Sequence, residues 1–491
     1  MRVKLFLVGS FLLSFGVVFS QNEDDALRYS LSFFGGTARN SATAGGLTAL
    51  GGDFANASQN PAGLGRLTKS NFSFTQNLEI PYVTTNFYGS ANSDFRVTYN
   101  LSNISYVKAY TLDPDKFNGW RSLQMGLGMN RKRSYNDSIT YSGIADSSIL
   151  HSFIREANGI STTFIYDALP FTAGLAYDTY AIDPLPDNTY TTQFNNGTAY
   201  HERRLKRKGG ITEFSLMTLS GNYANKLLLG GSINYVYAKY SETFRHKETY
   251  QDTTLWLNEI EYTGQLDIKG RGLNLRLGAI YMPTEQLRFG LAVETPTALW
   301  MNDYWTNNMT SQTKDGEKYV LAEYVPTGAY DYKIRTPFKA NVSAAAVVND
   351  LGSVGVEVEY IDYRMAKIMS KKFSDSPYSF AAENTQIDNI YKSCVNIKFG
   401  IEGRINKQLY ARGGFAYYGT PYKAASGNSQ DPMLFITGGA GYNFGTLYID
   451  MAYVLMSRKE EYYAYDPTIN GSHATFYNRN SQVLLTIGAR F

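Results

Sequence analysis

The chain has 491 residues and a net charge of +3; aromatic residues make up 15% and charged residues only 18%. This composition is too apolar and aromatic for a disordered chain, and the small net charge gives no reason to expect nucleic acid as a partner. A single cysteine excludes a disulfide framework and a cysteine zinc site. Four scattered histidines leave little for imidazole chemistry. We therefore expect a β-rich protein with no metal, no cofactor and no catalytic residues, and not an enzyme.

The N-terminus has the pattern of a secretory signal peptide. Arg2 and Lys4 precede an apolar run at 5–19, and Ser20 supplies a small residue at the cleavage position. The run is shorter than the ~18 apolar residues that a membrane anchor helix needs. We expect residues 1–20 to be removed and the mature protein to be exported.

Strand-like alternation dominates the sequence after residue 70. In 395–404 and 483–491, apolar side chains occupy every second position, and polar residues or glycine fill most positions between them. Transmembrane barrels need such alternation over about ten residues, with one face toward lipid and the other toward the lumen. Fourteen segments fit this pattern, namely 71–79, 96–109, 119–132, 211–223, 227–243, 258–281, 286–296, 330–348, 352–364, 391–404, 408–418, 432–443, 446–457 and 481–491.

The connections between these segments alternate in length. Tight turns, such as 224–226 and 444–445, alternate with long polar connections. The long connections are expected at 133–210, 244–257, 297–329, 365–390, 419–431 and 458–480. An even strand count with short turns at one end and long loops at the other is typical of outer-membrane barrels. The fold class expected is therefore all-β, a transmembrane antiparallel barrel of about fourteen strands that spans 71–491 in the cell outer membrane.

The segment 21–70 does not alternate and is rich in small residues. It contains the stretch GTARNSATAGGLTALGGDFANASQNPAGLG, in which glycine permits close packing and Pro61 fixes a turn. A compact segment of this kind, placed before a barrel, is expected to plug the lumen as a hatch. A periplasmic tail is the alternative.

This stretch resembles the N-terminal hatch of the FadL-type (OMPP1/FadL/TodX) outer-membrane transporters. Asn60-Pro61-Ala62 matches the hatch motif of that family, and the fourteen-strand count matches its barrel. The resemblance implies passive transport of hydrophobic molecules, such as long-chain fatty acids, through a hatch-gated barrel with lateral release into the bilayer. One departure is the acidic segment 22–25, which replaces the N-terminus that helps to close the ligand pocket in the fatty-acid transporter.

Candidate site residues follow from the hatch and from the longest loop. The hatch motif comprises Asn60, Pro61, Ala62 and Gly63. The apolar hatch residues that could line an inner pocket are Phe33, Phe34, Leu47, Phe54 and Leu64, with packing as the alternative. Helical spacing of apolar residues in the longest loop suggests a capture groove, or helices packed on the rim, formed by Ile149, Leu150, Phe153 and Ile154.

Charged residues suggest structural roles. Those expected to face the lumen carry both signs, including Arg276, Glu294 and Lys398, so mutual ion pairing is the expected arrangement. The basic run 201–208 is expected at the extracellular rim, either solvated or in contact with lipopolysaccharide phosphates.

Two functions remain open on the sequence alone. The first is transport of a hydrophobic small-molecule ligand by a monomer that contacts outer-membrane lipid and lipopolysaccharide. The alternative is a FadL-like barrel that binds proteins, similar to the shuttle of the type IX secretion system, for which the aromatic-rich loop 297–329 would be suitable. A haem receptor is disfavoured because scattered histidines offer poor axial ligands.

Overall fold

The computed structural model describes residues 23–194, 197–321, 325–371, 378–424 and 431–491. The expected signal peptide, residues 1–20, lies outside the described residues.

The described chain forms one closed antiparallel barrel with fourteen wall positions, and the last strand pairs with the first. Five wall positions are each shared by two consecutive strands that are separated by a short break. In wall order the strands are β1 (Asn71–Phe87), β2 (Ser90–Phe95) with β3 (Thr98–Thr111), β4 (Trp120–Ser134) with β5 (Asp137–Ala145), β8 (Ala199–Tyr223), β9 (Leu227–Tyr250), β10 (Leu257–Tyr281), β11 (Leu287–Glu294) with β12 (Ala298–Thr313), β14 (Thr327–Arg335) with β15 (Lys339–Val348), β16 (Gly352–Asp362) with β17 (Lys367–Ser370), β18 (Ser393–Arg404), β19 (Leu409–Tyr418), β20 (Met433–Asn443), β21 (Leu447–Tyr463) and β22 (His473–Arg490).

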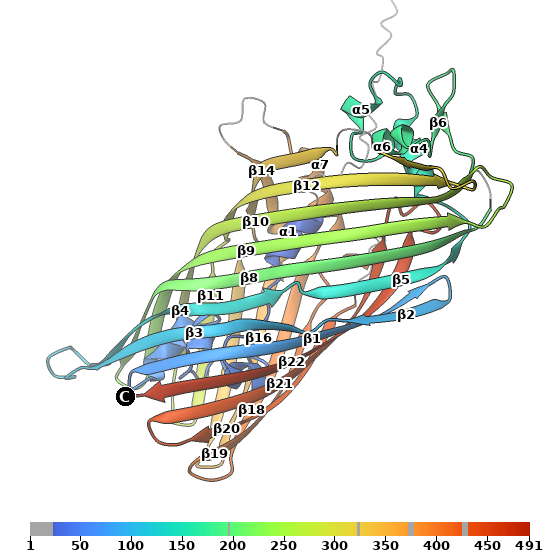
Figure 1. Ribbon diagram of the computed structural model, residues 1–491. Coiled ribbons are helices and arrows are strands. Elements are labelled where there is room, and N and C mark those ends of the chain that lie inside the picture. The colour runs from blue at the N-terminus through green and yellow to red at the C-terminus, as the bar shows by residue number, and fades with distance from the viewer. Residues whose placement is uncertain (1–22, 195–196, 322–324, 372–377, 425–430) are drawn as a thin grey trace, which may run out of the picture.

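The remaining elements lie inside the barrel or at one of its ends (Figure 1). The described residues before β1, 23–70, form the hatch, with α1 (Glu23–Ser30), α2 (Ala38–Ala42), α3 (Phe54–Ala57) and η1 (Pro61–Arg66). The other elements are α4 (Ile149–Ala157), α5 (Ile165–Ala168), α6 (Ala173–Asp178), β6 (Asp183–Pro184), β7 (Tyr190–Thr191), β13 (Lys318–Val320), η2 (Tyr363–Met365) and α7 (Ala381–Ile390). Among the described helices, none combines the length and the apolar character needed to cross a membrane.

The two ends of the barrel differ, as the loop lengths predict. The short connections and the C-terminal residue lie at one end, called here the turn end. Helices α4 to α6 gather at the opposite end, called here the loop end (Figure 1).

An apolar belt surrounds the half of the barrel near the turn end. Alternate side chains on the outer face of the strands are exposed and apolar, for example Leu127, Leu219, Leu275, Leu291, Ile397, Ile436, Met451 and Ile487. An outward apolar band of this kind faces lipid in transmembrane barrels. The fourteen-strand antiparallel barrel expected from the alternation is confirmed.

The strands extend farther toward the loop end than the sequence predicts. The expected loop 133–210 contains β5 and the first part of β8, and the expected loop 297–329 contains β12. The basic run 201–208 is therefore part of a strand, which corrects its placement in a loop. Its odd-numbered residues His201, Arg203 and Leu205 are buried toward the lumen. Beyond the belt, outward positions are polar, so the apolar alternation that marks a lipid-facing strand is absent there.

Candidate functional site

The hatch motif fastens the hatch to the barrel wall. Asn60 caps η1, because its Oδ1 accepts a hydrogen bond from the N–H of Ala62 at 3.0 Å. Its Nδ2 donates to the carbonyls of Ala279 on β10 and Leu291 on β11, each at 3.2 Å. The carbonyl of Ala62 accepts from Ser220 Oγ on β8 at 3.0 Å. The motif is thus hydrogen-bonded to three wall strands at once.

Glycines in the wall make room for this contact. Gly230 on β9 faces Gly278 on β10 in the strand register. A Cβ atom at Gly230 would lie 2.5 Å from the backbone nitrogen of Ala62 and 2.6 Å from the carbonyl carbon of Pro61. A Cβ at Gly278 would clash with Asn60 Oδ1. Because only glycine fits at these positions, the backbone of the hatch lies directly on the wall.

Buried charges reinforce the hatch. Arg39 of α2 makes two hydrogen bonds of 2.9 Å to Glu402 on β18, which Arg412 also contacts at 2.6 Å. Gln59 donates to Glu357 at 3.0 Å, and Glu357 also accepts from Lys398 at 2.8 Å. Further contacts between the hatch and charged wall residues are Lys339 with Ser32, Arg288 with the carbonyl of Leu50, and Arg276 with the carbonyl of Ala57.

The expected mutual pairing of lumen-facing charges is confirmed for most of them. Arg276 pairs with Glu213 at 2.8 Å and with Glu294. Arg412 pairs with Glu402 and with Asp450 at 2.5 Å. Removing one member of such a pair leaves an uncompensated buried charge. The lumen at the level of the hatch is therefore a fixed network of charges.

The hatch also closes a break in the wall between β3 and β4. The ladder between these strands joins Asn103–Thr111 to Ser122–Asn130 and does not continue through 98–102 of β3 among the described residues. Hatch backbone takes the place of the missing partner. The N–H of Phe33 donates to the carbonyl of Lys132 on β4 at 3.0 Å, and Ser102 on β3 donates to the carbonyl of Gly36 at 2.8 Å.

A cavity of about 800 Å³ lies between the hatch, the wall and the helices at the loop end. Its volume is in the range of small-molecule sites. The lining combines apolar and aromatic side chains with charges of both signs. The apolar and aromatic side chains include Leu27, Leu31, Phe33, Val83, Tyr240, Phe153, Met433 and Tyr462. The charged side chains include Asp24, Asp25, Arg28, Arg133, Asp137, Arg203, Arg207, Glu242, Arg458 and Glu460. The cavity is therefore amphipathic rather than purely apolar.

Helix α1 borders this cavity and is held by hydrogen bonds to the carbonyl of its residue Arg28. Arg133 Nη1 and the hydroxyl of Tyr135 donate to the carbonyl of Arg28 at 2.8 Å and 2.9 Å. The Arg28 guanidinium lies 4.2 Å from the ring centre of Tyr240. The acidic N-terminal segment noted in the sequence thus enters the lumen, where Asp24 and Asp25 border the cavity.

Arg133 is a positive charge in the lining of the cavity. Its guanidinium lies 4.9 Å from the ring centre of Tyr135 and 5.6 Å from that of Phe33. Within the described ranges, no carboxylate forms an ion pair with it. A half-buried guanidinium without a carboxylate partner favours an anionic group in the adjacent space.

Arg207 connects two acids at the side of the cavity. It lies 2.9 Å from Glu242 and 3.6 Å from Asp137. Burial opposes ionisation of Glu242, but Arg207 and the Tyr240 hydroxyl outweigh burial and lower the pKa of Glu242 to about 2. Burial raises the pKa of Asp137 to about 6, because Arg207 compensates only in part. Asp137 therefore gains a proton in mildly acidic solution.

Helix α4 covers the cavity and is fixed at its N-terminus. Ser148 caps the helix by accepting from the N–H of Leu150 at 3.1 Å, and its hydroxyl donates to Glu248 on β9 at 2.5 Å. The N–H of Ile149 also donates to Glu248, at 2.8 Å. A carboxylate at a helix N-terminus is favourable because it satisfies free N–H groups and the helix dipole. The helix is held on the wall at this point.

The candidate lining residues lie in two different environments. Phe33 borders the large cavity, and both Phe33 and Phe34 border small spaces beside the hatch. Leu47 lies against Gly355 and Gly400 of the wall, and Phe54 and Leu64 pack together against Gly126. The described cavities are not lined by Leu47, Phe54 or Leu64.

The candidate groove residues also lie in two environments, the large cavity and the apolar core of the loop elements. Ile149 and Phe153 border the large cavity from α4, and the Phe153 ring lies edge-on to Tyr262 at 5.3 Å. Leu150 is fully buried in the apolar core of the loop elements, and Ile154 packs against that core. The helix thus has one face toward the cavity and another in the loop core.

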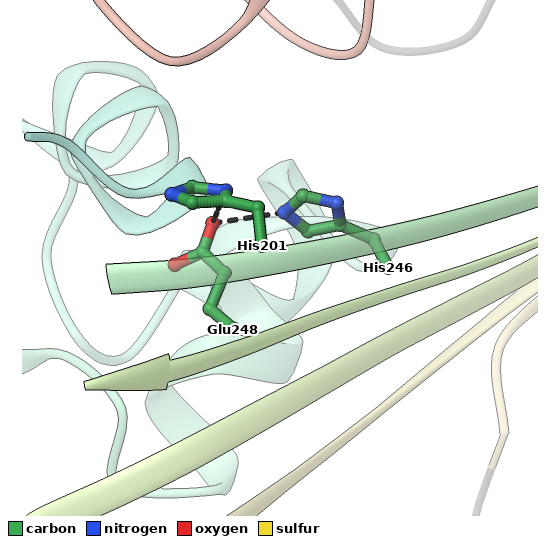
Figure 2. Close-up of side chains that lie close together, drawn as sticks. All are labelled: His201, His246 and Glu248. Atoms are coloured by element: carbon green, nitrogen blue, oxygen red, sulfur yellow. Dashed lines mark hydrogen bonds and ion pairs between the residues drawn. The ribbon is translucent and has the colours of Figure 1, made fainter. Parts of the chain in front are cut away.

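Two of the four histidines are not scattered, which corrects the expectation from the sequence. His201 on β8 lies opposite Glu248 on β9 in the register, and His246 precedes Glu248 by two residues on the same face (Figure 2). Because 244–257 is expected to be a loop, the sequence does not place His246 and Glu248 on a strand beside His201. The pattern His246-x-Glu248, with a histidine on the neighbouring strand, was the signal available in the sequence.

Solved structures show which proteins share this architecture. No family model matches the chain, and no curated protein matches it significantly. The crystal structure of a Pseudomonas aeruginosa FadL homologue aligns with a TM-score of 0.58 at 11% identity, covering 94% of this chain and 100% of the other. The Pseudomonas putida toluene transporter TodX aligns with a TM-score of 0.52 at 13% identity, covering 94% and 100%. The Ralstonia pickettii toluene transporter TbuX aligns with a TM-score of 0.50 at 15% identity, covering 94% and 99%. The resemblance to FadL-type proteins is thereby confirmed for the fold, and the chain has the hatch-plugged barrel fold of these transporters.

Proposed function

We propose that the protein is a passive outer-membrane transporter of hydrophobic and amphipathic small molecules. The observation that carries this proposal is the cavity of about 800 Å³, which lies directly on the hatch and shares Phe33 with the hatch segment that closes the wall break. A molecule in the cavity is therefore next to the one hatch segment whose movement would open the wall there. Solved barrels of this fold include the toluene transporters TodX and TbuX.

The cavity lining favours a ligand with an apolar body and an anionic head group. Leu27, Leu31 and Phe33 offer apolar surface on one side. Arg133 offers a positive charge without a carboxylate partner among the described residues. A long-chain carboxylic acid combines both features, and a charge-assisted hydrogen bond to the guanidinium would orient it.

The proposed exit is lateral. Displacing Phe33–Gly36 would remove the hydrogen bonds that bridge Lys132 and Ser102 and would open the wall between β3 and β4 at the edge of the apolar belt. An apolar solute leaving there enters lipid instead of water, which the hydrophobic effect favours.

The proposed orientation follows the general rule for outer-membrane barrels, with the turn end in the periplasm and the loop end outside. The cavity then opens toward the cell exterior above the hatch. The exposed basic side chains of β8 beyond the belt, Arg204 and Lys206, lie where lipopolysaccharide phosphates would be. A closed barrel needs no partner to protect strand edges, so a monomer is proposed.

Binding to the purified protein in detergent tests the proposal. We expect saturable, one-to-one binding of a fluorescent long-chain fatty acid that is displaced by unlabelled fatty acid. Leu31→Arg places a second charge in the apolar part of the cavity and should abolish binding. Leu277→Arg is the control for Leu31→Arg, because it also adds an arginine but places it on the outer face of the barrel, away from the cavity.

Two results would overturn the proposal. One is equal binding by wild type and Leu31→Arg, which would place the ligand outside the cavity. The other is absence of any apolar ligand together with stable retention of secreted proteins, which would support the protein-binding barrel instead.

A further inference from the structure

Three side chains with metal-binding atoms meet inside the barrel near the loop end (Figure 2). His201, His246 and Glu248 are all essentially fully buried. Their potential ligand atoms lie within 4.8 Å of one another. Glu248 Oε1 is 3.4 Å from His201 Nδ1 and 2.8 Å from His246 Nε2.

The hydrogen bonds around the cluster leave one nitrogen lone pair, that of His201 Nδ1, directed at the carboxylate, whereas His246 Nε2 donates to Glu248 Oε1 at 2.8 Å through a proton that a bound metal ion would displace. His201 Nε2 lies 3.0 Å from the carbonyl of Ser147, and a carbonyl only accepts, so this nitrogen carries the proton. In a neutral ring, His201 Nδ1 is then an acceptor that faces Glu248 Oε1, another acceptor. Among the described residues, His201 Nδ1 has no hydrogen-bond partner. Two buried acceptors that face each other are unfavourable unless a proton or a metal cation lies between them.

The distance between His201 Nδ1 and Glu248 Oε1 and the surroundings of the cluster suit a divalent transition metal. Bonds of about 2.0–2.1 Å in a tetrahedral site place ligand atoms about 3.3 Å apart, close to the 3.4 Å between His201 Nδ1 and Glu248 Oε1. The Ser147 carbonyl holds the remote nitrogen of His201, and Ser148 holds the other oxygen of Glu248 at 2.5 Å. Such contacts orient the ligands of metal sites.

We propose that His201 Nδ1, His246 Nε2 and Glu248 Oε1 bind a divalent transition-metal ion of the Zn²⁺ type, with water as a further ligand. The ion would fasten the N-terminus of α4 to β8 and β9, because Ser147 and Ile149 are bonded directly to two of its ligands. The cavity gives access, since Ile149 and Tyr465 border it and the Tyr465 ring lies 6.1 Å from His246.

The guanidinium of Arg203, the neighbouring positive charge, does not pair with Glu248 in the proposed metal site. Arg203 lies opposite His246 in the register. Its guanidinium is 4.5 Å from the ring centre of Phe244, and its Nε donates to the Tyr462 hydroxyl at 3.1 Å. The arginine is thus directed to aromatic partners, and Glu248 is left to balance the charge of the metal.

Zn²⁺ titration of the full mature chain in detergent, after removal of metal with a chelator, tests the proposal. We expect one equivalent of Zn²⁺ bound, and Co²⁺ in its place should give the visible absorption of a four-coordinate site. His246→Asn and Glu248→Gln should each weaken Zn²⁺ binding about 100-fold, because each removes one ligand. The matched control is His473→Asn, since His473 is an exposed histidine that lies 2.7 Å from Glu461. This control should bind Zn²⁺ as wild type does.

A second measurement keeps the test independent of variant folding. Zn²⁺ should slow amide hydrogen exchange of 149–157 in wild type without slowing exchange at 381–390, the distant helix α7. Absence of stoichiometric binding to folded wild type would overturn the proposal and leave Glu248 paired with a protonated His201. Equal binding by wild type and folded His246→Asn would also overturn it.

Discussion

Replacing Gly230 by alanine should loosen the hatch. The added Cβ would lie 2.5 Å from the nitrogen of Ala62, whereas ordinary contact begins at 3.4 Å, so η1 must move by about 1 Å. Overpacking of this size costs about 1–3 kcal/mol. The movement also strains the bond from Ser220 to the carbonyl of Ala62. Because 1.4 kcal/mol is about tenfold, the unseated fraction of hatches should rise about 5-fold to 150-fold.

Single-channel recording in planar bilayers measures this fraction as the share of the recording time that a channel spends open. Gly231→Ala is the matched control, because the adjacent Gly231 is on the other face of β9 and its Cβ would meet the tip of Leu277 at 3.2 Å and the carbonyl oxygen of Arg276 at an ordinary 3.7 Å. Conductance of Gly230→Ala that is indistinguishable from that of Gly231→Ala would refute the tight seating of the hatch.

Three further predictions concern the cavity and its cover. Arg133→Met should weaken binding of a long-chain carboxylate by about 1.5–3 kcal/mol, or at least about tenfold, while a neutral long-chain alcohol binds unchanged by calorimetry. Binding of a long-chain alkyl sulfonate, which stays ionised, should tighten as pH falls from 7 to 5, because burial raises the pKa of Asp137 to about 6 and that of Glu156 to about 7, and protonation of these two cavity residues removes two negative charges; the pH dependence should be weaker in Asp137→Asn, and an affinity that does not vary with pH in wild type would contradict this. Ser148→Ala removes the cap of α4 and should cost about 1 kcal/mol of local stability, seen as about fivefold faster hydrogen exchange at 149–157; unchanged exchange would show that the cap does not hold the helix.

The lipid-facing part of the fold could be predicted from the sequence because lipid imposes a strict rule. Outward positions such as Ile397 and Phe399 must be apolar, while inward positions such as Lys398 can be charged when they are paired. The hatch could be expected from its small residues and from Asn60-Pro61-Ala62. The contacts that seat it come from wall strands more than 150 residues away, which no local pattern reveals.

The loop end could not be predicted in the same way. The upper parts of β8, β9 and β12 lie beyond the apolar belt, where both faces of a strand carry polar side chains. Their alternation is therefore weak, and they resemble loops in the sequence. His201 and His246 were separated for this reason, although strand pairing brings them together.

The candidate ligand residues show a related limit. Phe33 and Leu64 are both apolar hatch residues, but Phe33 borders the cavity while Leu64 packs against the wall. The difference depends on how the hatch folds within the barrel, and amphipathic spacing does not specify this in a segment of short helices and turns.

The most direct test of the central claim is mass spectrometry of the molecules retained by the protein after purification in mild detergent from its native outer membrane. The proposed function predicts a stoichiometric apolar or amphipathic small molecule that is absent from the Leu31→Arg variant. Retention of secreted proteins with no such molecule in wild type would contradict it.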